Sequence, residues 1–246
     1  MVCLISPPMF KNIVVFLIGS VLNASLEIML EKENRDYGDT VVGSFLDTYH
    51  NLTLKAVMGY RWLSSRCRDV QLLIKMDDDV FFDVRKFFTR YWKRVGNDRK
   101  QKALHCLVWS RAAVGRAGKW KVEKDIFADS SYNFPYCSGF FVVISPDLIE
   151  SIYIHGRNMD FFWIDDVFLY GMVPASIGGV HFIQLASQKG MLVENYDDLL
   201  WCRERYSHEK CSIWAALTSK DSDFDFEYSA LLTPDLLRTG KHIPIK

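Results

Sequence analysis

The sequence lacks the short motifs that define several common enzyme classes. It has no G-x-G-x-x-G run and no Walker A sequence, which removes the usual signals of dinucleotide and P-loop nucleotide binding. It has no G-x-S-x-G elbow, so a serine hydrolase has no support. None of its six cysteines forms a C-x-x-C pair, and a structural zinc site is therefore not predicted.

An excess of one charge and a long apolar run are also missing. Lys and Arg number 30, as do Asp and Glu, so no net field favours nucleic acid or an anionic membrane. The apolar run at residues 13–22 has ten residues. A transmembrane helix needs about 20 residues, so this run is too short to cross a bilayer. It reads either as the apolar region of a signal peptide or as a buried parallel strand, and the family resemblance described below favours the strand.

What is present is enough apolar material for a large core: 49% of the 246 residues are hydrophobic. Strands are expected at 12–18, 41–42, 70–76, 104–109 and 140–144, and helices at 23–37, 45–66, 83–95, 147–154 and 160–171. This alternation predicts an α/β fold with a mostly parallel sheet flanked by helices. We expect a single domain over residues 12–215, with irregular or unassigned termini at 1–11 and 216–246.

The strongest local signal is the carboxylate run Asp77-Asp78-Asp79, which directly follows the apolar strand 70–76. Ligands of α/β sheets bind at the carboxyl ends of strands, and carboxylate oxygens suit Mg²⁺ or Mn²⁺, which bind phosphates. Asp77 and Asp79 share a face if the segment is extended, so one can hold a metal while the other meets a ribose. The alternative is a solvated acidic turn, but apolar residues on both sides favour the metal site.

A second carboxylate pair, Asp165-Asp166, lies in an aromatic-rich stretch. Burial would raise the pKa of such a carboxylate and suit it to general-base work, whereas the alternative is a helix N-cap. Gly139 follows Tyr136-Cys137-Ser138 and would let a ligand approach the backbone closely. The alternative for Gly139 is a simple bend before a strand.

In order and spacing these motifs resemble the β-1,3-galactosyltransferase family, which includes fringe-like relatives. The resemblance covers residues 12 to 175. The stretches that carry it are 36–39 (DYGD), 45–55 (FLDTYHNLTLK), 75–81 (KMDDDVF), 134–139 (FPYCSG) and 165–168 (DDVF).

The resemblance implies a GT-A fold and inverting, Mn²⁺-dependent transfer of galactose or N-acetylglucosamine from a UDP-sugar to a glycan acceptor hydroxyl. The linkage it implies is β-1,3. Asp79 would bind the metal, Asp77 would contact the donor's ribose and help to bind the metal, and Asp166 would be the general base. His208 is the candidate for a further metal ligand late in the chain, with His181 as the other possibility. The other donor-binding residues implied are Lys75, Asp78, Ser138 and Gly139.

Three departures from the family pattern qualify these expectations, and one of them is that neither His181 nor His208 lies in a motif like that of the family's late metal ligand. The family's first core strand and its membrane anchor have no counterpart, so the resemblance implies a truncated gene model, a fragment or a diverged copy. Phe140 and Phe141 replace a Gly-rich run after Gly139. The alternative function is therefore an inactive relative that binds glycan or a partner glycosyltransferase. The family resides in the Golgi, and the cysteines and two sequons, at Asn23 and Asn51, favour a secretory compartment.

Overall fold

The computed structural model describes residues 2–5, 11–67, 69–93, 101–186 and 190–218. The chain forms two compact units. The first unit comprises Met1–Asp77 and Asp98–Ser187, and the second comprises Asp78–Asn97 and Gln188–Lys246. The single domain predicted for residues 12–215 includes parts of both units and stays a prediction.

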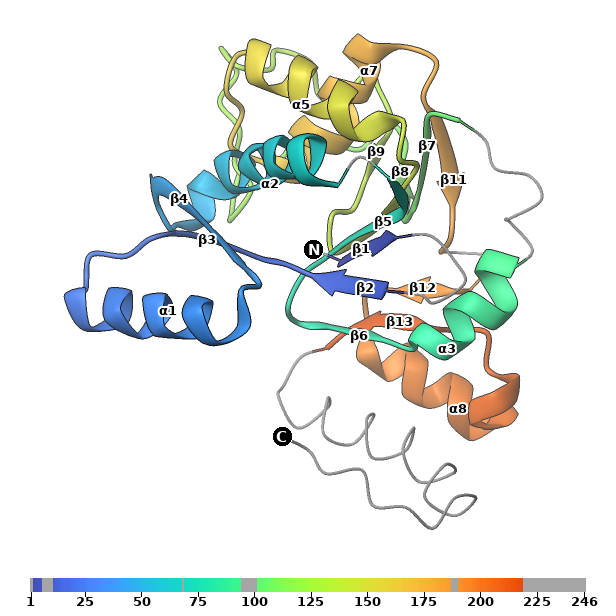
Figure 1. Ribbon diagram of the computed structural model, residues 1–246. Coiled ribbons are helices and arrows are strands. Elements are labelled where there is room, and N and C mark those ends of the chain that lie inside the picture. The colour runs from blue at the N-terminus through green and yellow to red at the C-terminus, as the bar shows by residue number, and fades with distance from the viewer. Residues whose placement is uncertain (1, 6–10, 68, 94–100, 187–189, 219–246) are drawn as a thin grey trace. The chain divides into compact units, whose positions relative to one another are not determined.

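A six-stranded sheet forms the centre of the first unit (Figure 1). Its strands, in spatial order, are β11 (His181–Gln184), β7 (Ala103–Cys106), β10 (Phe141–Ile144), β5 (Val70–Met76), β1 (Val2–Ile5) and β2 (Lys11–Val14). The predicted α/β class, with sheets flanked by helices, is confirmed. The expected parallel pairing is wrong for this sheet, because only β11 and β7 run parallel. Antiparallel strands can be joined without a helical crossover, and the described segment between β7 and β10 contains no helix.

The N-terminal part of the chain differs from the sequence expectation. Residues 1–11 were expected to be irregular, but Val2–Ile5 forms β1, which pairs antiparallel with both β2 and β5. The strand expected at 12–18 is divided into β2 and β3 (Phe16–Ser20). Strand β3 pairs in parallel with β4 (Thr40–Leu46), and the helix between them, α1 (Ala24–Tyr37), makes this a βαβ unit.

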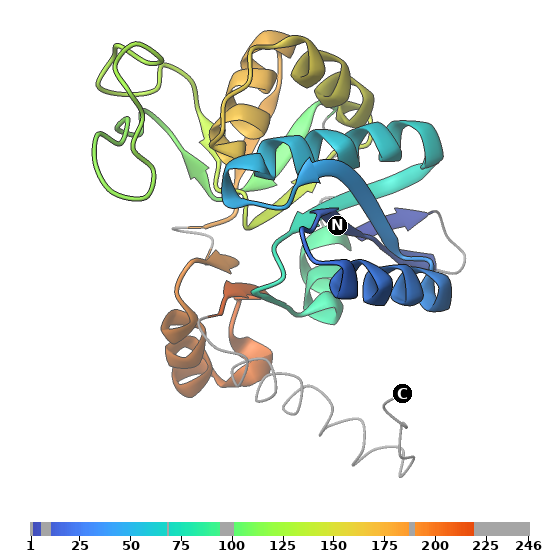
Figure 2. The same cartoon turned by 90° about the vertical axis from the view of Figure 1, so that its left-hand side faces the viewer.

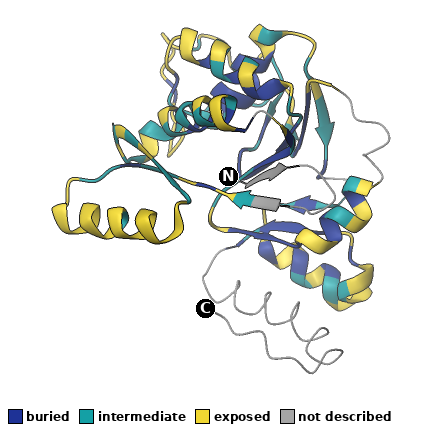
Figure 3. Cartoon of the chain, viewed as in Figure 1, coloured by how far each residue is buried: buried dark blue, intermediate teal, exposed yellow. Residues whose placement is uncertain are grey.

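Helix α1 confirms the helix predicted at 23–37. The side chain of Asn23 accepts the backbone N–H groups of Ser25 and Leu26, which caps the first turn. Gly38 ends the helix in the left-handed conformation. No residue of α1 is buried, as Figure 3 shows by its colour.

Two helices pack side by side on the six-stranded sheet in both views (Figures 1 and 2). They are α2 (Leu52–Arg66), which follows the short 3₁₀ helix η1 (Tyr49–Asn51), and α5 (Leu148–Asn158). The helix expected at 45–66 therefore begins later, because residues 45 and 46 belong to β4. The shared core includes Ala56, Tyr60, Leu63, Leu73, Leu104, Val142, Ile144, Leu148 and Ile152.

The chain continues from α5 into the segment that carries the second carboxylate pair. This segment consists of α6 (Asp165–Val167), the π-helical turn η3 (Phe168–Met172) and α7 (Val173–Ile177). A π-helical turn widens the helix locally, and such turns are frequent at functional sites. The two-stranded pair of β8 (Val108–Trp109) and β9 (Tyr136–Cys137) completes the described first unit.

The second unit has a three-stranded sheet of β12 (Leu192–Val193), β13 (Ala215–Leu217) and β6 (Val80–Phe82). Its helical elements are α3 (Val84–Lys86), the π-helical η2 (Phe87–Trp92) and α8 (Tyr196–Lys210). Residues 216 and 217, expected to be irregular, belong to β13, and residues 219–246 lie outside the described ranges. No helix in the described ranges combines the length and apolarity needed to cross a membrane.

Candidate active site

Strand β5 carries two charged side chains to its carboxyl end. Its apolar residues Leu72, Leu73 and Ile74 are fully buried, which fixes the strand in the core. The Nζ atom of Lys75 donates to Oδ1 of Asp77 and to the carbonyl oxygen of Gly139, both at 2.5 Å. The Lys75 side chain is 13% exposed and that of Asp77 is 44% exposed, so the ion pair lies at the edge of solvent.

Gly139 lies against the second predicted carboxylate pair. Its backbone N–H donates to the carboxylate of Asp166. A Cβ atom built at Gly139 would clash with Oδ1 of Asp166, so no other residue fits here without a shift. The group that lies closest to Gly139 in the structure is a protein carboxylate, and the predicted approach of a ligand to its backbone stays a prediction.

The electrostatics of this cluster set the protonation of Asp166. Burial, with the neighbouring Asp165 carboxylate, raises the pKa of Asp166 to about 7. Burial also raises the pKa of Asp165. Although burial alone would favour a neutral amine, the carboxylates of Asp77, Asp165 and Asp166 raise the pKa of Lys75 above its usual value. The cluster thus combines one fixed cation with a carboxylate that titrates near neutral pH, a combination typical of a catalytic base.

A disulfide between Cys106 and Cys137 holds the segment before Gly139 in place. It joins the end of β7 to β9, and the N–H of Ser138 donates to the carbonyl of Leu107 at 2.9 Å. A second disulfide joins Cys202 to Cys211, nine residues apart in the second unit. Sequence alone left the cysteine pairing open.

An aromatic cluster on the first unit was not predicted from the sequence. The indole Nε1 of Trp120 donates to the hydroxyl of Tyr49 at 2.8 Å, and the ammonium of Lys119 lies 4.2 Å from the centre of the Tyr49 ring. The rings of His50 and Trp163 are 4.6 Å apart between centroids. These residues come from three distant stretches, and no periodic pattern in the sequence joins them. Trp163 lies three residues before Asp166, the candidate base, in the sequence.

Among the remaining candidates, Asp78, Asp79 and His208 belong to the second unit, whereas His181 begins β11 in the first unit. Asp78 and Asp79 are exposed, and the carbonyl oxygen of Asp79 accepts both the N–H and the hydroxyl of Thr218. The Nε2 atom of His208 lies 3.8 Å from Oδ2 of the buried Asp83.

Lys86 makes the surroundings of His208 unfavourable for a metal. Its Nζ donates to the carbonyl of His208 at 3.1 Å. Burial, together with the positive charges of Lys86 and Arg203, lowers the pKa of His208. The positive charges of Lys86 and Arg203 would repel a metal ion at the His208 imidazole. We therefore do not propose His208 as a metal ligand.

The structure therefore brings together Lys75, Asp77, Gly139, Asp165 and Asp166 in the first unit. Within the described ranges, no group of three or more His, Cys, Asp or Glu side chains is arranged to hold a metal ion. A strand that ends in charged groups beside a carboxylate with a pKa near 7 is an arrangement found at sites with a general base.

The family follows from comparison with known proteins. A family model described as Galactosyltransferase matches residues 7–185, which is most of the chain. The chain belongs to this galactosyltransferase family.

Individual relatives agree with this assignment. Beta-1,3-galactosyltransferase 1 of Homo sapiens is 30% identical over 163 residues, covering 65% of this chain and 50% of the relative. Beta-1,3-galactosyltransferase 5 of Gorilla gorilla gorilla is 29% identical over 155 residues, covering 63% and 51%. The chain thus spans about half the length of the curated relatives it matches.

A solved glycosyltransferase structure is also similar to this chain. A glycosyltransferase involved in the glycosylation of the major capsid of PBCV-1 is 10% identical to this chain. The match covers 88% of this chain and 98% of that one, with a TM-score of 0.43. The assignment to the galactosyltransferase family rests on the sequence matches alone.

Proposed function

We propose that this chain is an inverting hexosyltransferase that moves galactose or N-acetylglucosamine from a UDP-sugar to a glycan acceptor hydroxyl, in β-1,3 linkage. The observation that carries the proposal is the carboxylate of Asp166, which accepts a hydrogen bond from the N–H of Gly139. Burial is the largest of the effects that raise the pKa of this carboxylate to about 7. A base with a pKa near the working pH is well matched to removing a proton from a sugar hydroxyl. Membership of the galactosyltransferase family supports glycosyl transfer as the reaction class.

In the proposed reaction, Asp166 takes the proton of the acceptor hydroxyl while the hydroxyl oxygen attacks the anomeric carbon of the donor sugar. The bond between that carbon and the UDP oxygen breaks, and UDP leaves with the bonding electron pair. Lys75 donates hydrogen bonds to the Asp77 carboxylate and to the Gly139 carbonyl oxygen. It therefore positions Gly139, whose backbone N–H donates to Asp166. Its positive charge also favours the ionised form of Asp166.

Mn²⁺ is the proposed cofactor, with Asp79 as its ligand and Asp77 at the donor's ribose and the metal. Three successive carboxylates are a donor set that fits a hard divalent cation, and this assignment rests on that chemistry and on the family. Asp77 also pairs with Lys75, which fixes its carboxylate at the end of β5. When bound, Mn²⁺ would neutralise the charge of the departing diphosphate.

A transfer assay tests this proposal. The purified chain is given UDP-galactose or UDP-N-acetylglucosamine with a panel of glycan acceptors, and the product is detected by mass spectrometry. We expect one donor to be used, in Mn²⁺ and not in EDTA. We expect Asp79→Asn to lower the rate by roughly 100-fold or more, because charge neutralisation of the leaving group is lost. Asp125→Asn, which removes an exposed carboxylate elsewhere, is the matched control and should leave the rate unchanged.

The negative outcomes of this assay separate two explanations. Absence of transfer, together with saturable binding of UDP and Mn²⁺, would overturn the catalytic proposal in favour of a non-catalytic relative that binds glycan. Absence of both transfer and UDP binding in the folded chain would contradict the donor site as well.

The aromatic cluster is the proposed platform for the acceptor. Trp120 is 56% exposed, and flat indole faces stack well on sugar rings. We expect Trp120→Ala to raise the acceptor KM by roughly tenfold through the loss of about 1–2 kcal/mol of packing, with the donor KM unchanged. Trp201→Ala, which removes an exposed tryptophan of the second unit, is the control. An equal rise in donor and acceptor KM would contradict the assignment.

The proposed location is the lumen of the secretory pathway, in the Golgi. The two disulfides support it, because disulfides persist in oxidising compartments. Microscopy of the tagged chain against a Golgi marker checks it, and a cytosolic signal would contradict it.

A further inference from the structure

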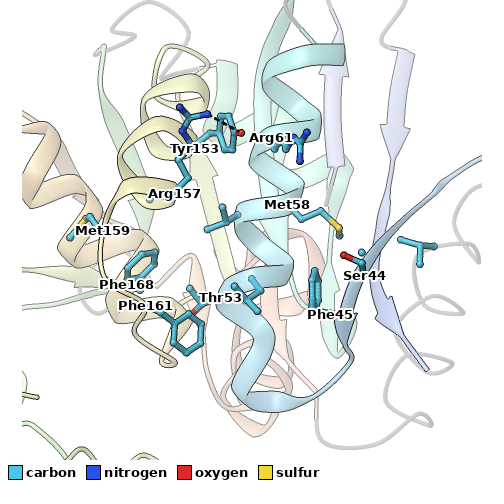
Figure 4. Close-up of a pocket in the computed structure, with 15 residues that line it drawn as sticks. Ser44, Phe45, Thr53, Met58, Arg61, Tyr153, Arg157, Met159, Phe161 and Phe168 are labelled. Carbon is cyan, nitrogen blue, oxygen red and sulfur yellow. Dashed lines mark hydrogen bonds between the residues drawn. The ribbon is translucent and has the colours of Figure 1, made fainter. Parts of the chain in front are cut away.

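A groove of about 710 Å³ lies between β4, α2 and α5 of the first unit (Figure 4). Its volume is within the range of roughly 300–1,000 Å³ that is usual for small-molecule sites. Its lining includes none of Lys75, Asp77, Gly139 or Asp166, so it is separate from the candidate active site. The galactosyl transfer proposed above gives this groove no role.

Most of the groove wall is apolar. Phe45, Leu54, Met58, Met159 and Phe161 all contribute to it. Leu54 is 39% exposed and Phe161 is 54% exposed, so the wall presents large apolar side chains to water. Exposed apolar surface that is gathered in a hollow marks a binding site more often than scattered exposed residues do. An alkyl chain is the kind of ligand that this wall suits.

One end of the groove is positively charged. The charged residues in its lining are Arg61 and Arg157, and no carboxylate lines it. Figure 4 shows both arginines with Tyr153 at one end, and Phe45 and Phe161 toward the other. None of the ion pairs found in the described ranges uses either arginine.

The hydroxyl of Tyr153, at the same end of the groove as Arg61 and Arg157, can also donate a hydrogen bond to a ligand. Nη1 of Arg157 donates to the hydroxyl of Tyr153 at 3.4 Å, and its guanidinium lies 5.4 Å from the centre of that ring. Because the phenol oxygen accepts this bond, its own proton is available for an anion. Arginine in the last turn of α5 also stabilises the helix end, but that role does not require an apolar hollow beside it.

We propose that this groove binds an amphipathic anion, with its alkyl chain on the apolar wall and its carboxylate or phosphate head at Arg61, Tyr153 and Arg157. The shared chemistry of the ligand is a single hydrocarbon chain with an anionic head. Fatty acids and alkyl phosphates both provide it, and the experiment distinguishes them.

Isothermal titration calorimetry with the full chain tests the proposal. The probes are laurate and dodecyl phosphate, each below its micelle concentration, and the controls are inorganic phosphate and dodecyl maltoside. We expect saturable binding of one molecule of laurate, dodecyl phosphate or both, and the tighter of the two identifies the head. Both controls should bind at least roughly tenfold more weakly, because each lacks half of the recognised chemistry.

Variants that lack arginine charges test whether Arg61 and Arg157 bind the anionic head. The double variant Arg61→Gln/Arg157→Gln should weaken binding of the anionic probes by roughly tenfold or more. Arg66→Gln, on the same helix α2 but outside the groove, should bind as the unchanged chain does. All three proteins are first shown to have the same melting temperature. Undiminished binding by the double variant, equal binding of dodecyl maltoside, or no binding of either anion would overturn the proposal.

Discussion

Replacing Asp166 with asparagine should lower kcat for transfer by roughly 10²- to 10⁴-fold, the usual contribution of a general base. Asparagine has nearly the same shape, and its side-chain oxygen can still accept the N–H of Gly139. It cannot take a proton from the acceptor hydroxyl. The KM for the UDP-sugar should stay within a factor of two or so, because Asp166 has no assigned contact with the donor.

Stability measurements separate this loss from unfolding. The pKa of Asp166 is raised by burial in the folded chain, so between its ordinary value and about 7 the folded state holds a proton that the unfolded state releases. Stability from this group therefore falls as pH rises through that window. Asp166→Asn removes the effect, so at pH 8 it should melt no lower than the unchanged chain. Asp160→Asn, an exposed carboxylate nearby, is the control and should keep full activity. A fully active Asp166→Asn variant would exclude Asp166 as the base.

Replacing Gly139 with alanine should reduce kcat/KM by roughly 100-fold, because misplacing a reacting group by about 1 Å can cost that much. The added Cβ would collide with Oδ1 of Asp166 and push the carboxylate away from the backbone N–H. The same N–H bond stabilises the ionised form, so its loss should also move the acid limb of the pH profile to higher pH.

Gly156 offers a matched control for this substitution. It is buried in helix α5, and the nearest atoms to an added Cβ lie at 3.6 Å or beyond, which is ordinary van der Waals contact. Gly156→Ala should therefore retain activity and fold at least as stably, since alanine favours helices. If Gly139→Ala keeps full activity, the close packing of Gly139 on Asp166 has no catalytic role.

Much of the first unit could be predicted from local pattern. The buried strand Val70–Met76 and the helix Ala24–Tyr37 have strong apolar or capping signals, and the structure confirms both. The sequence also predicts a site at the Asp165-Asp166 pair, because the two carboxylates lie in an aromatic-rich stretch. In the structure, Gly139 packs against Asp166, and the charge of Lys75 favours the ionised form of that carboxylate.

Other features depend on contacts that no local pattern encodes. Strand direction in the six-stranded sheet depends on how distant segments pair, so the expectation of parallel pairing was wrong. The aromatic cluster joins Tyr49 to Trp120 across 71 positions. The partner of His208 could not be predicted either, because Asp83 and Lys86 reach it only through tertiary packing.

The most direct test of the central claim is the pH dependence of kcat/KM for hexose transfer between pH 5 and 9, at saturating Mn²⁺. With Asp166 as the base, kcat/KM should fall about tenfold per pH unit below a midpoint near 7 and be level above it. The fall should be absent from the residual activity of Asp166→Asn. A profile that is level across the whole range, or one with the same limb in both proteins, would contradict the account.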